Sequence, residues 1–272
     1  MTQSRSNSDL RAHSNGDAGE LALASGHRMA WMGLGDSANR TVLLLHGFAS
    51  TARVNWFGTG WAETLVDAGY HVLAIDHRGH GGSSKYYAPT DYGPDIFAAD
   101  AIDCLDAFDL TRVAVIGYSM GARITSWLAA HYPDRVACAV FGGMGEHIYG
   151  GRGGYEAIAD ALETDDVDAI ADLGAKSFRL FADRTKSDRL ALAACIRPST
   201  KQITPDVLSA IQAPVLVAVG ADDGIAGRAE PLLDVLAHGE AITMPGLDHM
   251  RATGAAPFKE RTLTFLAEHF PA

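Results

Sequence analysis

Cysteine is scarce in this chain, and long apolar runs are missing from it. Cys104, Cys138 and Cys195 lie far apart without C-x-x-C spacing, which argues against a disulfide framework or a cysteine zinc site. We expect buried thiols in a reducing compartment, and hence a cytoplasmic protein. No window approaches the roughly eighteen uninterrupted apolar residues that a membrane span needs. Residues 1–20 are polar and lack the apolar centre of a secretory signal.

The chain also has few basic residues relative to acidic ones. Against 33 Asp and Glu there are only 22 Lys and Arg, which gives a formal net charge of −11. This excess of acid argues against nucleic acid and anionic membrane surfaces as partners. What remains is an ordinary globular composition, with 47% hydrophobic and 20% charged residues over 272 positions. We therefore expect the partner to be a small molecule.

Short apolar runs alternate with helix-like stretches over most of the chain. The runs are apolar throughout, as in strands that are covered on both faces, and they lie at residues 41–45, 71–76, 112–116 and 135–141. Helical patterns are expected at 56–68, 91–110, 121–131, 228–236 and 257–270. The order predicts an α/β fold with a mostly parallel, doubly wound sheet. Residues 19–26 and 28–33 alternate apolar and polar positions, which predicts an antiparallel hairpin at the sheet edge.

The alternation stops in the middle of the chain. Between residues 142 and 211 there are helical patterns but no convincing strand, and strand-helix order resumes at residue 213. This segment is therefore expected to be a helical insertion over the carboxyl edge of the sheet. The predicted organisation is a flexible tail at 1–18, a core formed by 19–142 and 213–272, and a helical cap at 143–212.

A serine between two glycines follows one of the predicted strands. The run Gly117-Tyr118-Ser119-Met120-Gly121 ends the strand and opens a helical stretch. A sharp strand-to-helix turn crowds the positions two before and two after the serine, where glycine fits most easily. The pattern predicts an exposed Ser119 on a strained turn. The simpler interpretation is a glycine-rich loop, since the chain contains 29 glycines.

Polar residues with complementary chemistry follow two later strands. Asp222 and Asp223 come after the run at 213–220, and His249 follows the last predicted strand. Loops at the carboxyl ends of parallel strands converge, so these side chains and Ser119 are expected at one edge. A serine hydroxyl needs a base such as histidine to become a nucleophile, and that histidine needs a carboxylate to orient it.

With these motifs the chain resembles the α/β-hydrolase fold superfamily, in particular serine hydrolases of the carboxylesterase or lipase type with a helical cap. The resemblance covers nearly everything from residue 19 onward. It rests on five motifs together: His46-Gly47-Phe48, Asp76-x-Arg78-Gly79-His80-Gly81, the Ser119 pentapeptide, Gly220-Ala221-Asp222-Asp223 and Gly246-Leu247-Asp248-His249.

The resemblance implies roles for individual residues. Ser119 would be the nucleophile, His249 the general base and then acid, and Asp223 the orienting carboxylate. Asp222 and, more remotely, Glu146 are the alternatives for that carboxylate. Helix N-capping is the structural interpretation of both aspartates.

The remaining site residues are expected around Ser119, Asp223 and His249. The backbone N–H groups of Met120, at a helix N-terminus, and of Phe48 would bind an oxyanion. Trp56 and Tyr149 are predicted to line the substrate pocket, although such aromatics also pack a cap on a core. His46 is expected to brace its loop without transferring protons.

These residues predict a serine hydrolase that needs neither metal nor cofactor. Ser119 would attack a carbonyl to form an acyl-enzyme, which water activated by His249 would then hydrolyse. A small carboxylic ester is the first substrate class, and a C–C bond hydrolase, a lactonase or an amidase would use the same triad. Epoxide and haloalkane hydrolysis would need a carboxylate in place of Ser119. A non-catalytic small-molecule receptor and a cofactor-free haloperoxidase are the other hypotheses.

Overall fold

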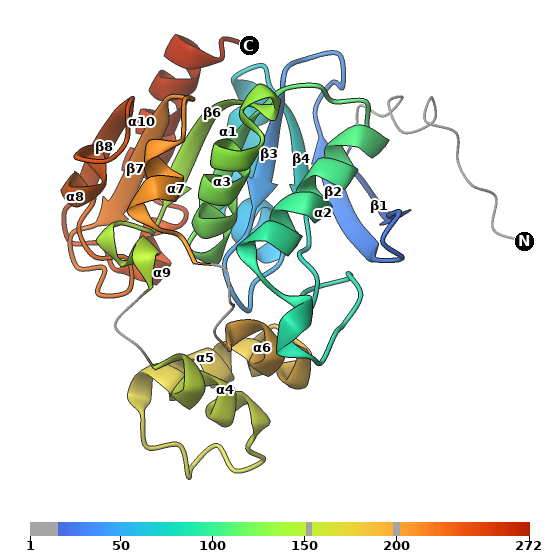
Figure 1. Cartoon of the computed structure of the whole chain (residues 1–272), viewed down its shortest axis with the longest axis vertical. Coiled ribbons are helices and arrows are strands. Elements are labelled where there is room, and N and C mark those ends of the chain that lie inside the picture. Colours follow the sequence, from blue (N-terminus) through green and yellow to red (C-terminus); the bar gives the residue numbers. More distant parts are fainter. Residues whose placement is uncertain (1–15, 151–153, 198–201) are drawn as a thin grey trace, which may run out of the picture.

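The computed structural model describes residues 16–150, 154–197 and 202–272. Its centre is an eight-stranded sheet with the strand order β1-β2-β4-β3-β5-β6-β7-β8 (Figure 1). The strands are β1 (Asp17–Ala22), β2 (Arg28–Leu34), β3 (Thr41–Leu45), β4 (His71–Ile75), β5 (Val113–Tyr118), β6 (Val136–Gly142), β7 (Val215–Gly220) and β8 (Gly239–Met244).

The sheet is parallel from β4 to β8 and antiparallel at one edge. β3 pairs in parallel with β4 and β5, and the parallel pairing continues through β6, β7 and β8. β1 and β2 form an antiparallel hairpin, and β2 also runs antiparallel to β4. This confirms the predicted α/β fold with a mostly parallel sheet and an edge hairpin. β1 begins at Asp17, so residues 17 and 18, placed in the tail by the sequence, belong to the sheet.

Helices cover both faces of the sheet. The helices that accompany it are α1 (Trp61–Asp67), α2 (Pro94–Ala107), α3 (Met120–His131), α7 (Pro205–Ser209), α8 (Glu230–Leu233), α9 (His249–Ala252) and α10 (Ala256–His269). Because strand side chains alternate, Leu43 and Leu45 join the apolar layer under α2 and α3, whereas Val42 and Leu44 join the layer under α1 and α10. All four are fully buried, which explains why these strands are apolar throughout.

Two predicted helices differ from those observed. The predicted helix at 56–68 overlaps the end of a π-helical turn, η2 (Arg53–Phe57), and α1 follows that turn. Gly60 separates them with a φ of 71°, a left-handed conformation that interrupts a helix. The helix expected near residue 228 is the four-residue α8. Both differences arise from backbone turns that hydrophobic periodicity does not report.

Three further helices stand apart from the sheet. They are α4 (Tyr155–Glu163), α5 (Leu173–Arg184) and α6 (Arg189–Ile196), and in Figure 1 they lie together below the sheet. Side chains from all three pack in one apolar cluster with Phe48 and Ala49 of the loop after β3. Helix α7 lies within the predicted cap range 143–212, but its Leu208 packs in the core cluster beside α3. Among the described residues no helix combines the length and apolarity needed to cross a bilayer.

Candidate active site

Ser119 occupies a strained turn between β5 and α3. Its φ of 54° and ψ of −112° lie in a region that residues with a side chain rarely adopt. A Cβ atom on Gly121 would lie 1.9 Å from the carbonyl oxygen of Leu45, and one on Gly117 would lie 2.2 Å from the carbonyl oxygen of Gly121. Both flanking positions therefore require glycine, because neighbouring backbone already fills the space. The turn holds the Ser119 hydroxyl at the carboxyl end of β5.

A hydrogen-bonded row joins three residues that are distant in sequence. His249 Nε2 lies 3.0 Å from Ser119 Oγ, and His249 Nδ1 lies 2.8 Å from Asp223 Oδ2. Asp223 follows β7, and His249 is the first residue of α9 after β8. Since the Asp223 carboxylate accepts, Nδ1 donates and Nε2 is left to accept from the serine hydroxyl. The Asp223 side chain is 0% exposed and that of His249 11% exposed.

Of the three candidate carboxylates, Asp223 is the one that contacts His249. Its other oxygen, Oδ1, accepts from the backbone N–H groups of Ile225 and Ala226 at 3.0 and 2.9 Å. Asp223 thus holds both His249 and the turn that follows β7, and it caps no helix, because the next helix, α8, begins at Glu230. Asp222 is exposed, and Glu146 Oε1 binds Arg228 at 3.3 Å.

Two residues that sequence reasoning missed hold His249 in place. Asp248 caps α9, because its Oδ1 accepts from the N–H groups of Met250 and Arg251 at 3.0 and 2.8 Å. An aspartate before a helical stretch is a recognisable capping signal. The hydroxyl of Tyr118 donates to the backbone carbonyl of His249. Burial raises the pKa of Tyr118, so the phenol keeps the proton that it donates. No sequence pattern indicated this contact.

The loop after β3 is held by hydrogen bonds on both sides of Gly47. The carbonyl of Gly47 accepts from His46 Nδ1 at 2.8 Å and from the N–H of Ser50 at 3.2 Å. The N–H of Gly47 donates to Asn55 Oδ1 at 3.1 Å. His46 Nε2 accepts from the N–H of His77, and burial lowers the pKa of His46 to about 4, so its ring is neutral. His46 therefore braces the loop, as predicted.

Two backbone donors lie beside Ser119. The N–H of Phe48 belongs to the peptide whose carbonyl His46 binds, and in the described part of the chain it has no acceptor. Met120 is the first residue of α3, where a backbone N–H has no intrahelical acceptor. A Cβ on Gly47 would lie 3.4 Å from the Cβ of Ser119, so this loop borders the nucleophile turn.

The two aromatic residues predicted to bind substrate differ in their surroundings. Trp56 is fully buried and packs edge-on against Trp61, with ring centroids 6.0 Å apart, in the layer under α1 and α10. The prediction for Trp56 is wrong, because its side chain fills the core and leaves no face for a ligand. Tyr149 is half-buried against the main core cluster, and no described contact joins it to Ser119 or His249. Its role stays a prediction.

Helix α5 contacts the predicted oxyanion loop directly. Phe178 of α5 packs edge-on against Phe48, with ring centroids 5.8 Å apart. Phe48 in turn packs edge-on against His80, whose Nδ1 bonds the carbonyl of Arg78 at 3.0 Å. The helices α4, α5 and α6 and the loop that borders Ser119 therefore share one apolar cluster.

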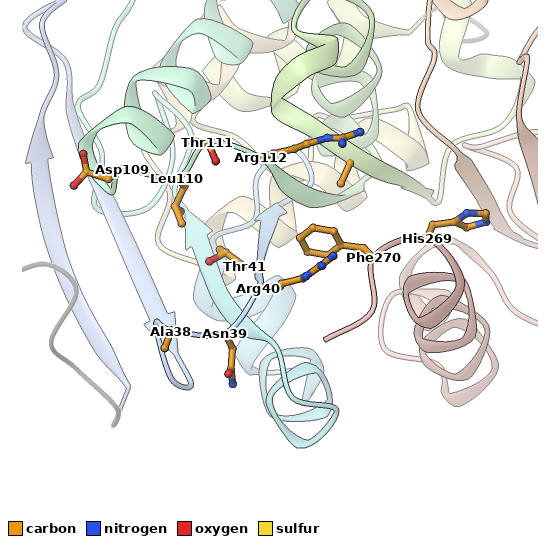
Figure 2. A pocket seen from close by; sticks show the side chains of 11 residues that line it. Ala38, Asn39, Arg40, Thr41, Asp109, Leu110, Thr111, Arg112, His269 and Phe270 are labelled. Atoms are coloured by element: carbon orange, nitrogen blue, oxygen red, sulfur yellow. The ribbon is translucent and has the colours of Figure 1, made fainter.

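Other polar features lie away from Ser119. The three-residue group of carboxylate and imidazole ligand atoms found among the described residues is Glu240, Glu268 and His269, on β8 and α10. A depression of about 450 Å³ lies at the amino ends of β3 and β5, where Arg40 and Arg112 line it together with Phe270 (Figure 2). Ser119 stands at the opposite, carboxyl end of β5.

Comparison with known proteins gives the following relatives. The chain is 28% identical over 270 residues to the dihydrolipoyllysine-residue acetyltransferase component of an acetoin cleaving system from Pseudomonas putida. This match covers 93% of this chain and 70% of that protein. It is 39% identical over 105 residues to rhodomycin D methylesterase from Streptomyces sp. strain C5, and 35% identical over 108 residues to epoxide hydrolase B from Mycobacterium tuberculosis. These two matches cover 38% and 39% of this chain, and only 35% and 29% of the relatives.

Solved structures show the same fold. An esterase from Rhodococcus sp. ECU1013 superposes with a TM-score of 0.72 at 24% identity, covering 93% of this chain and 99% of the esterase. A bromoperoxidase from Bacillus anthracis superposes with a TM-score of 0.76 at 23% identity, covering 92% and 99%. The sequence profile of the alpha/beta hydrolase fold matches residues 40–201. The strained serine turn, the parallel sheet and this match agree, and the chain belongs to the alpha/beta hydrolase fold family.

Proposed function

We propose that this protein is a serine hydrolase that cleaves small carboxylic esters through an acyl-enzyme on Ser119. The observation that carries the proposal is the row in which His249 lies 3.0 Å from Ser119 Oγ and 2.8 Å from Asp223. A hydroxyl, an imidazole and a buried carboxylate in hydrogen-bond contact form an activated nucleophile.

The first half of the reaction follows from this geometry. His249 Nε2 takes the hydroxyl proton while Ser119 Oγ attacks the ester carbonyl carbon. Asp223 stabilises the resulting imidazolium. The N–H groups of Met120 and Phe48 donate to the oxyanion of the tetrahedral intermediate, and the α3 dipole adds to the Met120 contribution. When the intermediate collapses, His249 returns the proton to the departing alcohol.

The second half repeats these steps with water. His249 removes a proton from a water molecule, whose oxygen attacks the acyl carbon. The same two N–H groups stabilise the second oxyanion. Collapse releases the carboxylic acid as Ser119 Oγ recovers its proton from His249. The helices α4, α5 and α6 are proposed to cover this site as its cap.

The relatives support an ester as the substrate class. A methylesterase aligns at 39% identity with part of the chain, and an esterase shares the fold. An epoxide hydrolase also aligns, but epoxide opening needs a carboxylate nucleophile, and the turn in this chain carries Ser119. The described thiols are free, which supports a reducing, cytoplasmic location.

Covalent labelling tests the proposal. The wild type is expected to hydrolyse short p-nitrophenyl esters and to gain one fluorophosphonate adduct by intact-mass measurement, mapped to Ser119. Ser119→Ala should lose both properties while remaining folded by circular dichroism. Ser177→Ala, which changes an exposed serine of α5, is the matched control and should behave like the wild type. A folded wild type that neither labels nor hydrolyses would overturn the proposal in favour of a receptor.

A further inference from the structure

Arg123 lies one helical turn after Ser119 in α3. Its backbone N–H contacts the carbonyl of Ser119 at 3.3 Å. Its Nη2 donates to the carbonyl oxygen of His147 at 2.6 Å and to the hydroxyl of Tyr155 at 3.1 Å. His147 lies in the 3₁₀ turn η5 (Glu146–Tyr149), and Tyr155 begins α4. The guanidinium therefore lies where α3 meets the entry to the cap helices.

No carboxylate pairs with Arg123 among the described residues. Arg123 is half-buried, and two arginines that are buried more deeply do have such partners. Arg78 binds both oxygens of Asp100 at 2.7 and 2.6 Å, and Arg179 binds both oxygens of Asp183 at 3.2 and 3.0 Å. Outside the described ranges the sequence contains a single acidic residue, Asp9. The positive charge of Arg123 is thus compensated only by neutral dipoles in the described chain.

A half-buried charge without a counter-ion is unfavourable, because burial removes part of the water that stabilises it. Burial lowers the pKa of Arg123 from its ordinary value, and the Tyr155 hydroxyl opposes this. Within the described chain no group accepts from Nε or Nη1, and both nitrogens keep some solvent access. The N–H groups of these two nitrogens are available to an incoming acceptor.

We propose that Arg123 binds a carboxylate of the substrate and that the favoured substrates are therefore esters with a free carboxylate near the scissile bond. This rests on the proposed serine hydrolase function. Arg123 lies in the first turn of α3, where side chains tilt toward the helix N-terminus, and Ser119 directly precedes that terminus. A substrate whose carboxylate is a few carbon atoms from the scissile carbonyl spans the distance from Ser119 to the guanidinium.

The overall charge makes a local cation necessary for such a substrate. With a formal net charge of −11, the field of the whole protein repels anions. Binding of a carboxylate must therefore come from close contact. A guanidinium N–H that is not already donating supplies a charge-assisted hydrogen bond to a carboxylate, which gives both attraction and orientation.

A matched pair of esters tests the proposal. Mono-p-nitrophenyl glutarate and p-nitrophenyl valerate have acyl chains of the same length but differ in a terminal carboxylate. The ratio of their kcat/KM values should favour the glutarate in the wild type. In Arg123→Gln the ratio should fall about 10- to 100-fold, mainly through KM for the glutarate, because a charge-assisted contact is lost. Arg123→Lys should recover part of the ratio, since it keeps the charge without the planar fork.

Two controls separate binding from structure. Arg112→Gln removes the same charge at the opposite end of β5, in the depression shown in Figure 2, and should leave the ratio unchanged. Tyr155→Phe removes one contact between Arg123 and α4 but keeps the charge, so it should also retain the preference for the glutarate. Thermal unfolding of each variant shows whether the fold is intact.

The outcomes distinguish this inference from the proposed function. If both esters are hydrolysed and Arg123→Gln has the wild-type ratio, the carboxylate site is refuted and the hydrolase remains. If the wild type hydrolyses neither ester and takes no fluorophosphonate label, the proposed hydrolase function is refuted. Binding of glutarate then tests the carboxylate site at Arg123 separately. Glutarate should then raise the unfolding temperature of the wild type more than that of Arg123→Gln, and equal shifts would refute the inference.

Discussion

The two carboxylate oxygens of Asp223 make different contacts. Oδ2 accepts from His249 Nδ1, and Oδ1 accepts from the N–H groups of Ile225 and Ala226. The backbone contacts hold the carboxylate in one orientation, so the His249 ring is held as well. Because Oδ2 accepts from Nδ1, the Nδ1–H of His249 is directed at Asp223, and Nε2 is left to face Ser119.

Asp223→Asn should reduce kcat about 10³- to 10⁴-fold on a p-nitrophenyl ester, because an amide group in this position favours the wrong imidazole tautomer. The measurement is steady-state kinetics with urea unfolding as a check on the fold. Asp222→Asn makes the same chemical change at the adjacent, exposed position and should retain activity. Equal losses in the two variants would mean that Asp223 does not orient the base.

At the scale of single elements, the turn from β5 to α3 depends on close backbone approach. Gly121 faces the carbonyl of Leu45 so closely that an added Cβ would lie 1.9 Å from the oxygen. Relief would require β3 and α3 to move apart, which would displace Met120 in α3 and Phe48 in the loop after β3. The strain at Ser119 is therefore maintained by the packing of a neighbouring strand.

Gly121→Ala should lower the free energy of unfolding by about 2 kcal/mol or more, because a methyl group in this position overpacks backbone that cannot yield. Urea unfolding followed by circular dichroism measures the change. Gly224→Ala is the control, since a Cβ there meets nothing within 4 Å. Its effect should stay within about 0.5 kcal/mol. A similar stability for the two variants would contradict the steric argument.

The π-helical turn η2 also acts on the site as an element. It directs Trp56 into the core and Asn55 toward Gly47. The Asn55 Oδ1 accepts a hydrogen bond from the N–H of Gly47 at 3.1 Å. Asn55 is buried, so the contact has no water to replace it. Through this bond the turn orients the peptide that precedes the N–H of Phe48. π-Helical turns are often found at functional sites for such reasons.

Asn55→Ala should lower kcat about tenfold or more with little change in KM, because it leaves the N–H of Gly47 unpaired and shifts an oxyanion donor. Asn55→Asp keeps an acceptor at the same place but adds a charge beside the developing oxyanion, so it should also lower kcat while preserving stability better than alanine. Kinetics and thermal unfolding together test this. A loss of stability without any loss of kcat would show a purely structural role.

At the scale of the whole molecule, three buried histidines join the loops that follow β3 and β4. The ring centroids of His46 and His77 are 4.4 Å apart, and those of His46 and His80 are 5.2 Å apart. Burial lowers the pKa of all three, to about 4 for His46 and about 3 for His80. The folded protein therefore keeps these rings neutral, whereas the unfolded chain takes up protons below pH 6.5, the ordinary pKa of histidine.

The stability of the fold should consequently decrease in mild acid. Between about pH 6.5 and about pH 4 the unfolded state binds more protons than the folded state, so the free energy of unfolding falls as the pH falls. His80→Gln removes one of these groups and should reduce that slope by up to about 1.4 kcal/mol per pH unit. Urea unfolding at a series of pH values measures both slopes. Identical slopes would mean that His80 is not neutral in the fold.

Much of the architecture could be predicted from the sequence. Strands covered on both faces are recognisable because each is apolar throughout, and the order of strands and helices implies a parallel sheet. The helix at 56–68 was wrongly predicted because the left-handed turn at Gly60 leaves no trace in apolar periodicity. Trp56 was wrongly predicted to bind substrate, because the sequence pattern of an aromatic residue near a strand end is the same whether its side chain faces a ligand or the core.

The sequence by itself determined the local chemistry: a serine between two required glycines, carboxylates and a histidine after later strands, and a chain order suited to their meeting. These are properties of spacing and residue type, which are local. Only the tertiary structure decided that Asp223 rather than Asp222 or Glu146 contacts His249, that Tyr118 holds its backbone, and that Arg123 has no described counter-ion. Those facts are distances between segments far apart in the chain, and folding sets such distances.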